Sequence, residues 1–172
     1  MRRIATVIVV VAAAITAASA AAENPGGRIT PTSIGAAGLG ATASQYRAAF
    51  GKALESALPE NRRQLMFNER ELSVILGRDG KGLALITPAH EFKTAGGVGP
   101  CAPIAALKKA YPHRLVPRFA KYTHTLLAYT VGNLTFTVRS NATIGVVMLA
   151  SPAISVQTAV NAPQCGSGEE GE

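Results

Sequence analysis

The chain of 172 residues carries 17 Lys and Arg against 10 Asp and Glu, a formal net charge of +7. This basic balance favours anionic partners, such as a wall polymer, a lipid surface or an acidic protein. Tryptophan is absent and aromatic residues make up 5% of the chain, so we expect an aliphatic core. The two cysteines are too few for a structural zinc site, which needs four ligands.

The N-terminus has the pattern of a secretory signal peptide. Arg2 and Arg3 precede an apolar run from Ile4 to Ala18, and small residues follow around Ala20. We therefore expect a signal peptide over residues 1–22 and a secreted, extracytoplasmic protein. The apolar run is shorter than the roughly 20 residues that a membrane-spanning helix needs, so the chain should not span a membrane. A retained N-terminal anchor is the alternative.

The next segment predicts a leader and then a helix. Residues 23–33 are polar and rich in Pro and Gly, which is typical of a flexible leader. The hydroxyl of Thr42 or Ser44 can cap a helix, because it accepts hydrogen bonds from backbone groups that lack a partner there. The apolar residues beyond this cap recur at helical spacing. The helix either ends after Phe50 or continues to Pro59.

Strand-like sequence follows in two groups. In the first, residues 64–68 predict a short strand, and residues 71–77 and 82–87 predict a hairpin through Asp79-Gly80. Asp and Gly tolerate the positive φ angles of a tight turn. The second group is a meander with a turn at Gly132-Asn133, and its strands are expected over residues 126–132, 133–139 and 143–150.

Residues 94–112, between these two groups, combine a glycine-rich turn, a cysteine and a second helix. Pro103 suits a first helical turn, where its missing N–H needs no partner, and Pro112 stops the helix. The basic segment 113–125 predicts a loop or an edge strand. The residues 151–172 are small and polar, and they predict a C-terminal tail.

The order of helix, strands, helix and strands predicts an α+β domain over residues 34–150. The two helix regions resemble each other, and Tyr46 in the first corresponds to Leu107 in the second. We therefore expect two helix-plus-antiparallel-sheet halves, about 34–93 and 94–150, that share one mostly antiparallel sheet.

Cys101 and Cys165 are the only cysteines of the chain. In an exported protein such a pair is expected to form a disulfide, and two free thiols are the alternative. The bond would tether the tail at Cys165 to the central segment. Closing a loop of this length stabilises a fold by about 4 kcal/mol in the chain-entropy model.

The sequence contains no evident catalytic or metal-binding constellation. Asp79 is the only aspartate and lies in the predicted hairpin, and no serine stands in a G-x-S-x-G pattern. His90, His113 and His124 lack the i, i+4 spacing of a helical metal site. We therefore expect no enzyme, no cofactor and no metal, with a small secreted hydrolase as the remote alternative.

One cluster of positive charge is a candidate binding patch. It consists of Lys108, Lys109, Arg114, Arg118 and Lys121. Tyr111, Phe119 and Tyr122 lie between these residues, so the patch could contact an anionic polymer or a protein. A solvated surface is the simpler interpretation. Nucleic acid is not expected, because the chain is exported and its total charge is modest.

Three segments carry a resemblance to a known family. They read IGAAGLGATASQYRAAFG, TAGGVGPCAPIAALKKAYP and AYTVGNLTF. They resemble a group of actinobacterial exported proteins that are similar to the β-lactamase inhibitor protein and the outer-membrane assembly lipoprotein BamE. The resemblance covers roughly residues 33–150. It implies helices packed on a small antiparallel sheet, in two tandem copies in the inhibitor, and protein binding rather than catalysis.

These observations lead to two expected functions. The first is a secreted, non-catalytic protein-binding module of the cell envelope or medium, with enzyme inhibition as one form of that binding. The second is a basic module that binds an anionic wall polymer or lipid surface through residues 108–121. The protein itself is expected to be a monomer.

Overall fold

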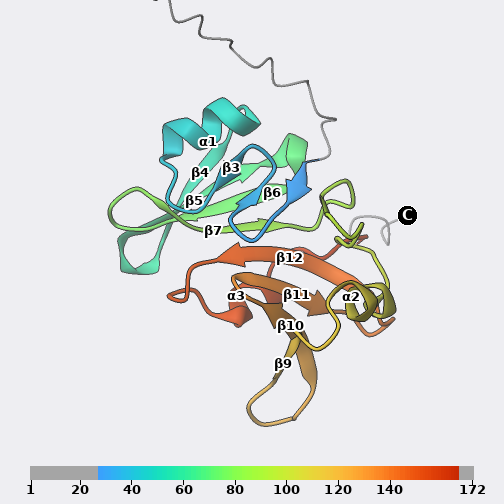
Figure 1. Cartoon of the computed structure of the whole chain (residues 1–172). Coiled ribbons are helices and arrows are strands. Elements are labelled where there is room, and N and C mark those ends of the chain that lie inside the picture. The colour runs from blue at the N-terminus through green and yellow to red at the C-terminus, as the bar shows by residue number, and fades with distance from the viewer. Residues whose placement is uncertain (1–26, 167–172) are drawn as a thin grey trace, which may run out of the picture.

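The structure is a computed structural model that describes residues 27–166, so the expected signal peptide over 1–22 lies outside the described residues. A sheet of eight strands forms its centre, and a second sheet and three α-helices pack on it (Figure 1). Every neighbouring pair in the large sheet is antiparallel. The expected mostly antiparallel sheet is thus confirmed, within an α+β fold that has few helices.

The large sheet has the order β4-β5-β6-β7-β12-β11-β10-β9. Its first four strands are β4 (Leu54–Leu58), β5 (Arg62–Phe67), β6 (Leu72–Leu76) and β7 (Gly82–Thr87). The other four are β9 (Val116–Phe119), β10 (Leu126–Val131), β11 (Leu134–Val138) and β12 (Ile144–Ala150). Two meanders therefore meet where β7 pairs with β12, and β4 and β9 form the two edges.

The small sheet has the order β3-β2-β1-β8. Its strands are β1 (Arg28–Ile29), β2 (Ser33–Ile34), β3 (Ala37–Gly38) and β8 (Lys93–Thr94). The helices are α1 (Ala43–Phe50), α2 (Ile104–Ala110) and α3 (Val156–Val160), and two 3₁₀ turns span Pro59–Asn61 and Asn68–Arg70. The pairing of β1 with β8 is parallel and joins segments that lie far apart in the sequence.

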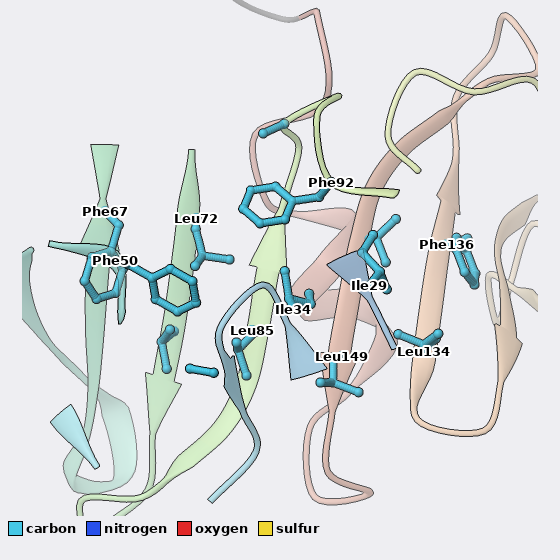
Figure 2. Close-up of a cluster of buried hydrophobic side chains, with 14 of the residues drawn as sticks. Ile29, Ile34, Phe50, Phe67, Leu72, Leu85, Phe92, Leu134, Phe136 and Leu149 are labelled. Carbon is cyan, nitrogen blue, oxygen red and sulfur yellow. The ribbon is translucent and has the colours of Figure 1, made fainter. Parts of the chain in front are cut away.

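One face of the large sheet, called the first face here, carries the main hydrophobic core. The core combines side chains of both meanders with Tyr46 of α1, Leu107 of α2 and residues of the small sheet. Figure 2 shows Ile29 and Ile34 of the small sheet between the two meanders. The small sheet therefore covers the seam at which β7 and β12 pair.

The opposite face, called the second face here, carries a smaller core. Its sheet residues are Ile75, Ala84, Ile86, Val146, Met148 and Ala150. Ile154 and Ala159, from the α3 region, pack against them. Because α3 contacts β10, β11 and β12, it lies mainly over the second meander.

The predicted turns are confirmed in place and differ in detail. Asp79-Gly80 lies in the loop between β6 and β7, where Gly80 has φ 74° and the Lys81 N–H donates to Asp79 Oδ1 at 3.1 Å. This loop is longer than a two-residue turn, since the Gly77 N–H donates to the Lys81 carbonyl. The β10–β11 turn has the expected two residues.

The expectation of a flexible leader over residues 23–33 is wrong for the described part of that segment. Residues 28–29 and 33–34 are strands, and the Ile29 side chain is only 2% exposed. This burial depends on the pairing of β1 with β8, whose residues lie more than sixty positions away in the chain. A local reading of Pro and Gly content cannot detect such a pairing.

Of the two alternatives for the first helix, the shorter one is confirmed, because α1 ends at Phe50 with Gly51 as its C-cap. Residues 54–58 form the edge strand β4, which excludes a helix that continues to Pro59. The expected C-terminal tail is ordered secondary structure over its described part, because α3 packs on the second face. The expected edge strand within 113–125 is confirmed as β9.

The disulfide between Cys101 and Cys165 is confirmed, with the two Cα atoms 5.6 Å apart. The backbone around it is also held, because the Cys101 N–H donates to the Ile144 carbonyl and the Cys165 N–H to that of Gly145. The disulfide therefore links the start of α2 and the segment after α3 to the same strand, β12.

The starts of α1 and α2 contact the large sheet in the same way. The N-cap of α1 is Thr42, one of the two expected candidates, and its side chain and that of Gln45 form a reciprocal capping box. Thr42 bridges to Lys81, at the start of β7, and the α2 N-cap Pro103 bridges to Thr143, at the start of β12. The start of each helix thus pairs with the last hairpin of the meander that follows this helix in the sequence.

Tyr46 holds α1 against the sheet from within the core. Its side chain is fully buried, and its hydroxyl donates to the Gly38 carbonyl at 2.5 Å. Burial raises the pKa of Tyr46 from 10.0 to about 12, while a hydrogen bond with the Ala41 backbone opposes the shift. The folded protein therefore keeps this proton at pH values where the unfolded chain releases it.

We expect the free energy of unfolding to fall as the pH rises from about 10 to 12, because the unfolded chain then binds fewer protons than the folded protein. The Tyr46 contribution to this fall should be about 1–3 kcal/mol. Urea unfolding at pH 9 and pH 11.5 measures it, and Tyr46→Phe serves as the reference. An equal pH dependence in both proteins would contradict the assignment, as would a tyrosine absorbance titration that is unchanged by Tyr46→Phe.

Candidate binding surface

The edge strand β9 and its neighbour β10 form a hairpin that projects from the large sheet (Figure 1). Its loop, residues 120–125, is closed by backbone hydrogen bonds. The Ala120 N–H donates to the Thr125 carbonyl at 2.8 Å, and the His124 N–H donates back to Ala120 at 3.2 Å. His124 adopts a positive φ of 52°, which allows the chain to reverse here.

Large apolar side chains are exposed on this hairpin. Val116 is 48% exposed, Phe119 55% and Tyr122 86%. Within the described part of the chain the only other large apolar side chain so exposed is Leu54, on the opposite edge strand. Phe119 and Tyr122 line the same hollow, and exposed apolar groups that lie together mark interaction sites far more often than single ones do.

Positive charge surrounds these apolar groups. The Lys121 ammonium lies 5.4 Å from the centre of the Tyr122 ring, a cation–π contact. Arg118 donates through Nε to the Thr130 hydroxyl at 3.2 Å, so its guanidinium lies along the second face. Arg114 is exposed just before β9. The hairpin thus offers aromatic and cationic groups together.

The five residues of the sequence-predicted patch do not share one face. Lys108 and Lys109 lie in the last turn of α2, and the Lys108 ammonium is 5.7 Å from the ring of Tyr129. Tyr129 packs against the first-face core, whereas Arg118 lies on the second face. The patch therefore wraps around the β9 edge of the sheet.

A charge asymmetry along the chain enlarges this basic region. Between Glu91 and Glu169 the sequence contains no Asp or Glu. It contains seven cationic residues there, namely Lys93, Lys108, Lys109, Arg114, Arg118, Lys121 and Arg139. The second meander therefore carries nearly uncompensated positive charge, which attracts anionic partners over about a Debye length.

A hollow lies beside the hairpin. Its walls are the hairpin loop and Leu127 on one side and residues 155–157, at the start of α3, on the other. The hollow opens next to Phe119 and Tyr122. A side chain of a partner could therefore lie between the hairpin and α3.

A second concavity, of about 600 Å³, lies over the first meander on the second face. Its floor includes Gln64, Met66 and Ile86, and its far wall is the segment 162–166 that the disulfide holds. Sequence reasoning missed this groove, because only folding brings the C-terminal segment beside β5 and β6. The one available signal was the predicted cysteine pair.

Few titratable groups line the groove. Apart from the disulfide, its titratable lining residues are Glu71 and His90. Over residues 27–166, no three His, Cys, Asp or Glu side chains gather where they could hold a metal ion. His113 and His124 stand at turns with positive φ, on either side of β9.

None of the helices over residues 27–166 is long and apolar enough to cross a membrane. We found no match to this chain among protein-family models, curated proteins or solved structures. The function is therefore inferred from the geometry described above.

Proposed function

We propose that the protein is an exported, non-catalytic binding module that holds an acidic partner protein through the β9–β10 hairpin. One observation carries the proposal: three of the exposed large apolar side chains lie on a single projecting hairpin that is surrounded by positive charge. Exposed aromatic side chains are typical anchors of protein interfaces, and charge around them guides the encounter with the partner.

The mode of recognition follows from the edge strand itself. β9 contains Pro117, which has no backbone N–H, and Arg118, a charged residue at an edge. Proline and charge on an edge strand disfavour the addition of another strand. The partner should therefore be recognised by the side chains Phe119, Tyr122 and Lys121 rather than by strand addition.

Two features support the cellular setting and the architecture of this proposal. A disulfide that closes the folded domain is typical of proteins outside the cytoplasm. The mirrored strand order and the matching helix entries support two tandem helix-plus-sheet units, the arrangement implied by the resemblance to the inhibitor family. Inhibition of an enzyme is one form that binding to its surface could take.

The double variant Phe119→Ala with Tyr122→Ala should lose the partner. Removing two central aromatic anchors is expected to weaken binding about tenfold or more. The measurement is affinity capture from the native secretome on immobilised protein, followed by titration of the captured species. Leu54→Ala is the control for the loss of an exposed apolar side chain away from the hairpin, since Leu54 is 60% exposed on the far edge. Equal capture by wild type and the double variant would contradict the proposal.

A second candidate is binding to an anionic wall polymer or lipid surface. The absence of Asp and Glu between Glu91 and Glu169 favours it, because a uniformly basic surface binds polyanions without specific contacts. Charge reversal at Lys108, Lys109 and Arg114 should then abolish sedimentation with envelope fractions. Under this candidate the aromatic double variant should still sediment, and no stoichiometric protein should be captured.

A further inference from the structure

The opposite edge of the large sheet, β4, has different properties from β9. β4 pairs with β5 on one side only, and no other strand within residues 27–166 pairs with its free side. Leu54 at its start is 60% exposed. The strand therefore presents unpaired backbone N–H and carbonyl groups beside an exposed apolar side chain.

β4 also lacks the features that usually protect an edge. Its sequence LESAL contains no Pro, Lys or Arg. Its one charge, Glu55, is engaged by Arg47 at 2.5 Å and by Arg63 at 2.8 Å. The Arg47 hydrogen bond is the main reason why the pKa of Glu55 is lowered. Because Glu55 points to the first face beside Leu65, it does not block the free edge.

We propose that β4 is a self-association site, at which two copies of this chain pair their β4 strands antiparallel about a two-fold axis at Ser56. In this register Leu54 lies opposite Leu58 of the second copy, and Glu55 lies opposite Ala57. Apolar groups therefore meet apolar groups and no like charges face each other, as a symmetric contact requires.

Neighbouring registers are less favourable. An axis at Glu55 places the two Glu55 side chains opposite each other, and like charges in that position are destabilising. An axis at Ala57 leaves Leu54 beyond the end of the partner strand, so that Leu54 and Leu58 are no longer paired with each other. Of these three registers, the one about Ser56 is thus the one that pairs the leucines and keeps the two Glu55 carboxylates apart.

The pairing joins two large sheets into one continuous sheet and leaves both β9–β10 hairpins at its outer ends. A contact limited to one short strand per copy is small compared with a stable interface. The dimer should therefore form at high protein concentration rather than at trace levels. This dimer differs from the monomer expected from the sequence, and its formation does not depend on the proposed partner.

The test combines mass measurement with cross-linking on the oxidised full chain. Sedimentation equilibrium of the wild type should show the average mass rising from monomer toward dimer with concentration. Ser56→Lys places two lysines face to face and should keep the protein monomeric. Phe119→Ala with Tyr122→Ala should leave the dimer intact, which separates this contact from the hairpin. Matching thermal melts confirm that each variant is folded.

Cysteine substitution tests the register. The described cysteines are both in the native disulfide, so a single added thiol reports on the new contact. Under mild oxidation Ser56→Cys should form a covalent dimer, because the two residues at position 56 lie opposite each other. Leu54→Cys should not, because the residues at position 54 of the two copies are four positions apart along the paired strands. A wild type that stays monomeric at millimolar concentration overturns the proposal. So does a dimer that persists in Ser56→Lys, or one that Leu54→Cys cross-links as readily as Ser56→Cys.

Discussion

Replacing both cysteines, Cys101→Ser with Cys165→Ser, should lower the free energy of unfolding by about 4 kcal/mol. The bond spans 64 positions of sequence, so its loss returns a large amount of conformational entropy to the unfolded chain. For a domain of this size the melting temperature should fall on the order of 10–15 °C. Urea unfolding of the oxidised wild type and the double variant measures the difference.

The same variant should loosen one part of the molecule more than the rest. The segment after α3 keeps other contacts, since Arg139 donates to the Cys165 carbonyl and Gln164 donates to that of Ala162 at 2.6 Å. We therefore expect faster amide exchange over residues 161–166 and little change in β5 to β7. Wild type reduced with a phosphine should match the double variant. A loss below about 1 kcal/mol would show that these hydrogen bonds, and not the disulfide, hold the segment.

Gly82→Ala should destabilise the fold by about 3 kcal/mol, because its new methyl group would overlap Tyr46. A Cβ at position 82 would lie 1.9 Å from the Tyr46 hydroxyl oxygen and 2.6 Å from Cζ. The ring cannot withdraw easily, since it is fully buried and bound to Gly38. The strand cannot shift easily either, because the Gly82 N–H donates to the Ala41 carbonyl at 2.9 Å.

Gly96→Ala is the matched control for this substitution. Gly96 has no positive φ, it is exposed, and the nearest atom to an added Cβ is the Ala110 Cβ at 3.2 Å. Its loss of stability should stay within about 1 kcal/mol. Combining Gly82→Ala with Tyr46→Phe removes the closest overlapping atom, the tyrosine hydroxyl oxygen. The double variant should therefore lose less unfolding free energy than the sum of the losses in the two single variants. Equal melting curves for the two alanine variants would contradict the close packing.

Several parts of the fold could be predicted because their signals are local. The turns at Asp79-Gly80 and Gly132-Asn133 lie where two strand-like runs meet, and residues that tolerate positive φ identify them. The capping hydroxyl of Thr42 marked the start of α1, and Pro112 follows closely after the end of α2. The cysteine pair predicted the disulfide.

Other parts could not be predicted, because distant segments decide them. β1 is a strand only because β8 pairs with it, and its Pro- and Gly-rich surroundings suggested a flexible leader. β4 follows a helix and contains Ala and Leu, so its sequence is compatible with a longer helix until β5 pairs with it. α3 has only five residues, too few to form alone, and packing on the second face stabilises it.

The candidate binding surface was likewise only partly predictable from the sequence. The residues of the basic cluster and the aromatic residues among them are visible in the sequence. Their separation onto two faces is not, because it depends on the pairing of β9 with β10 and on the packing of α2. Nor could the sequence indicate that Phe119 and Tyr122 are exposed while Phe136 is buried.

The sequence by itself therefore determined the charge, the cysteine pair, the turns and the alternation of helices and strands. These features depend on the chemistry of residues and on their near neighbours. The tertiary structure alone decided which strands became edges and which aromatic side chains remained in solvent. Burial depends on contacts between residues distant in the sequence, and the two edges, β4 and β9, exist only once the two meanders have joined at β7 and β12.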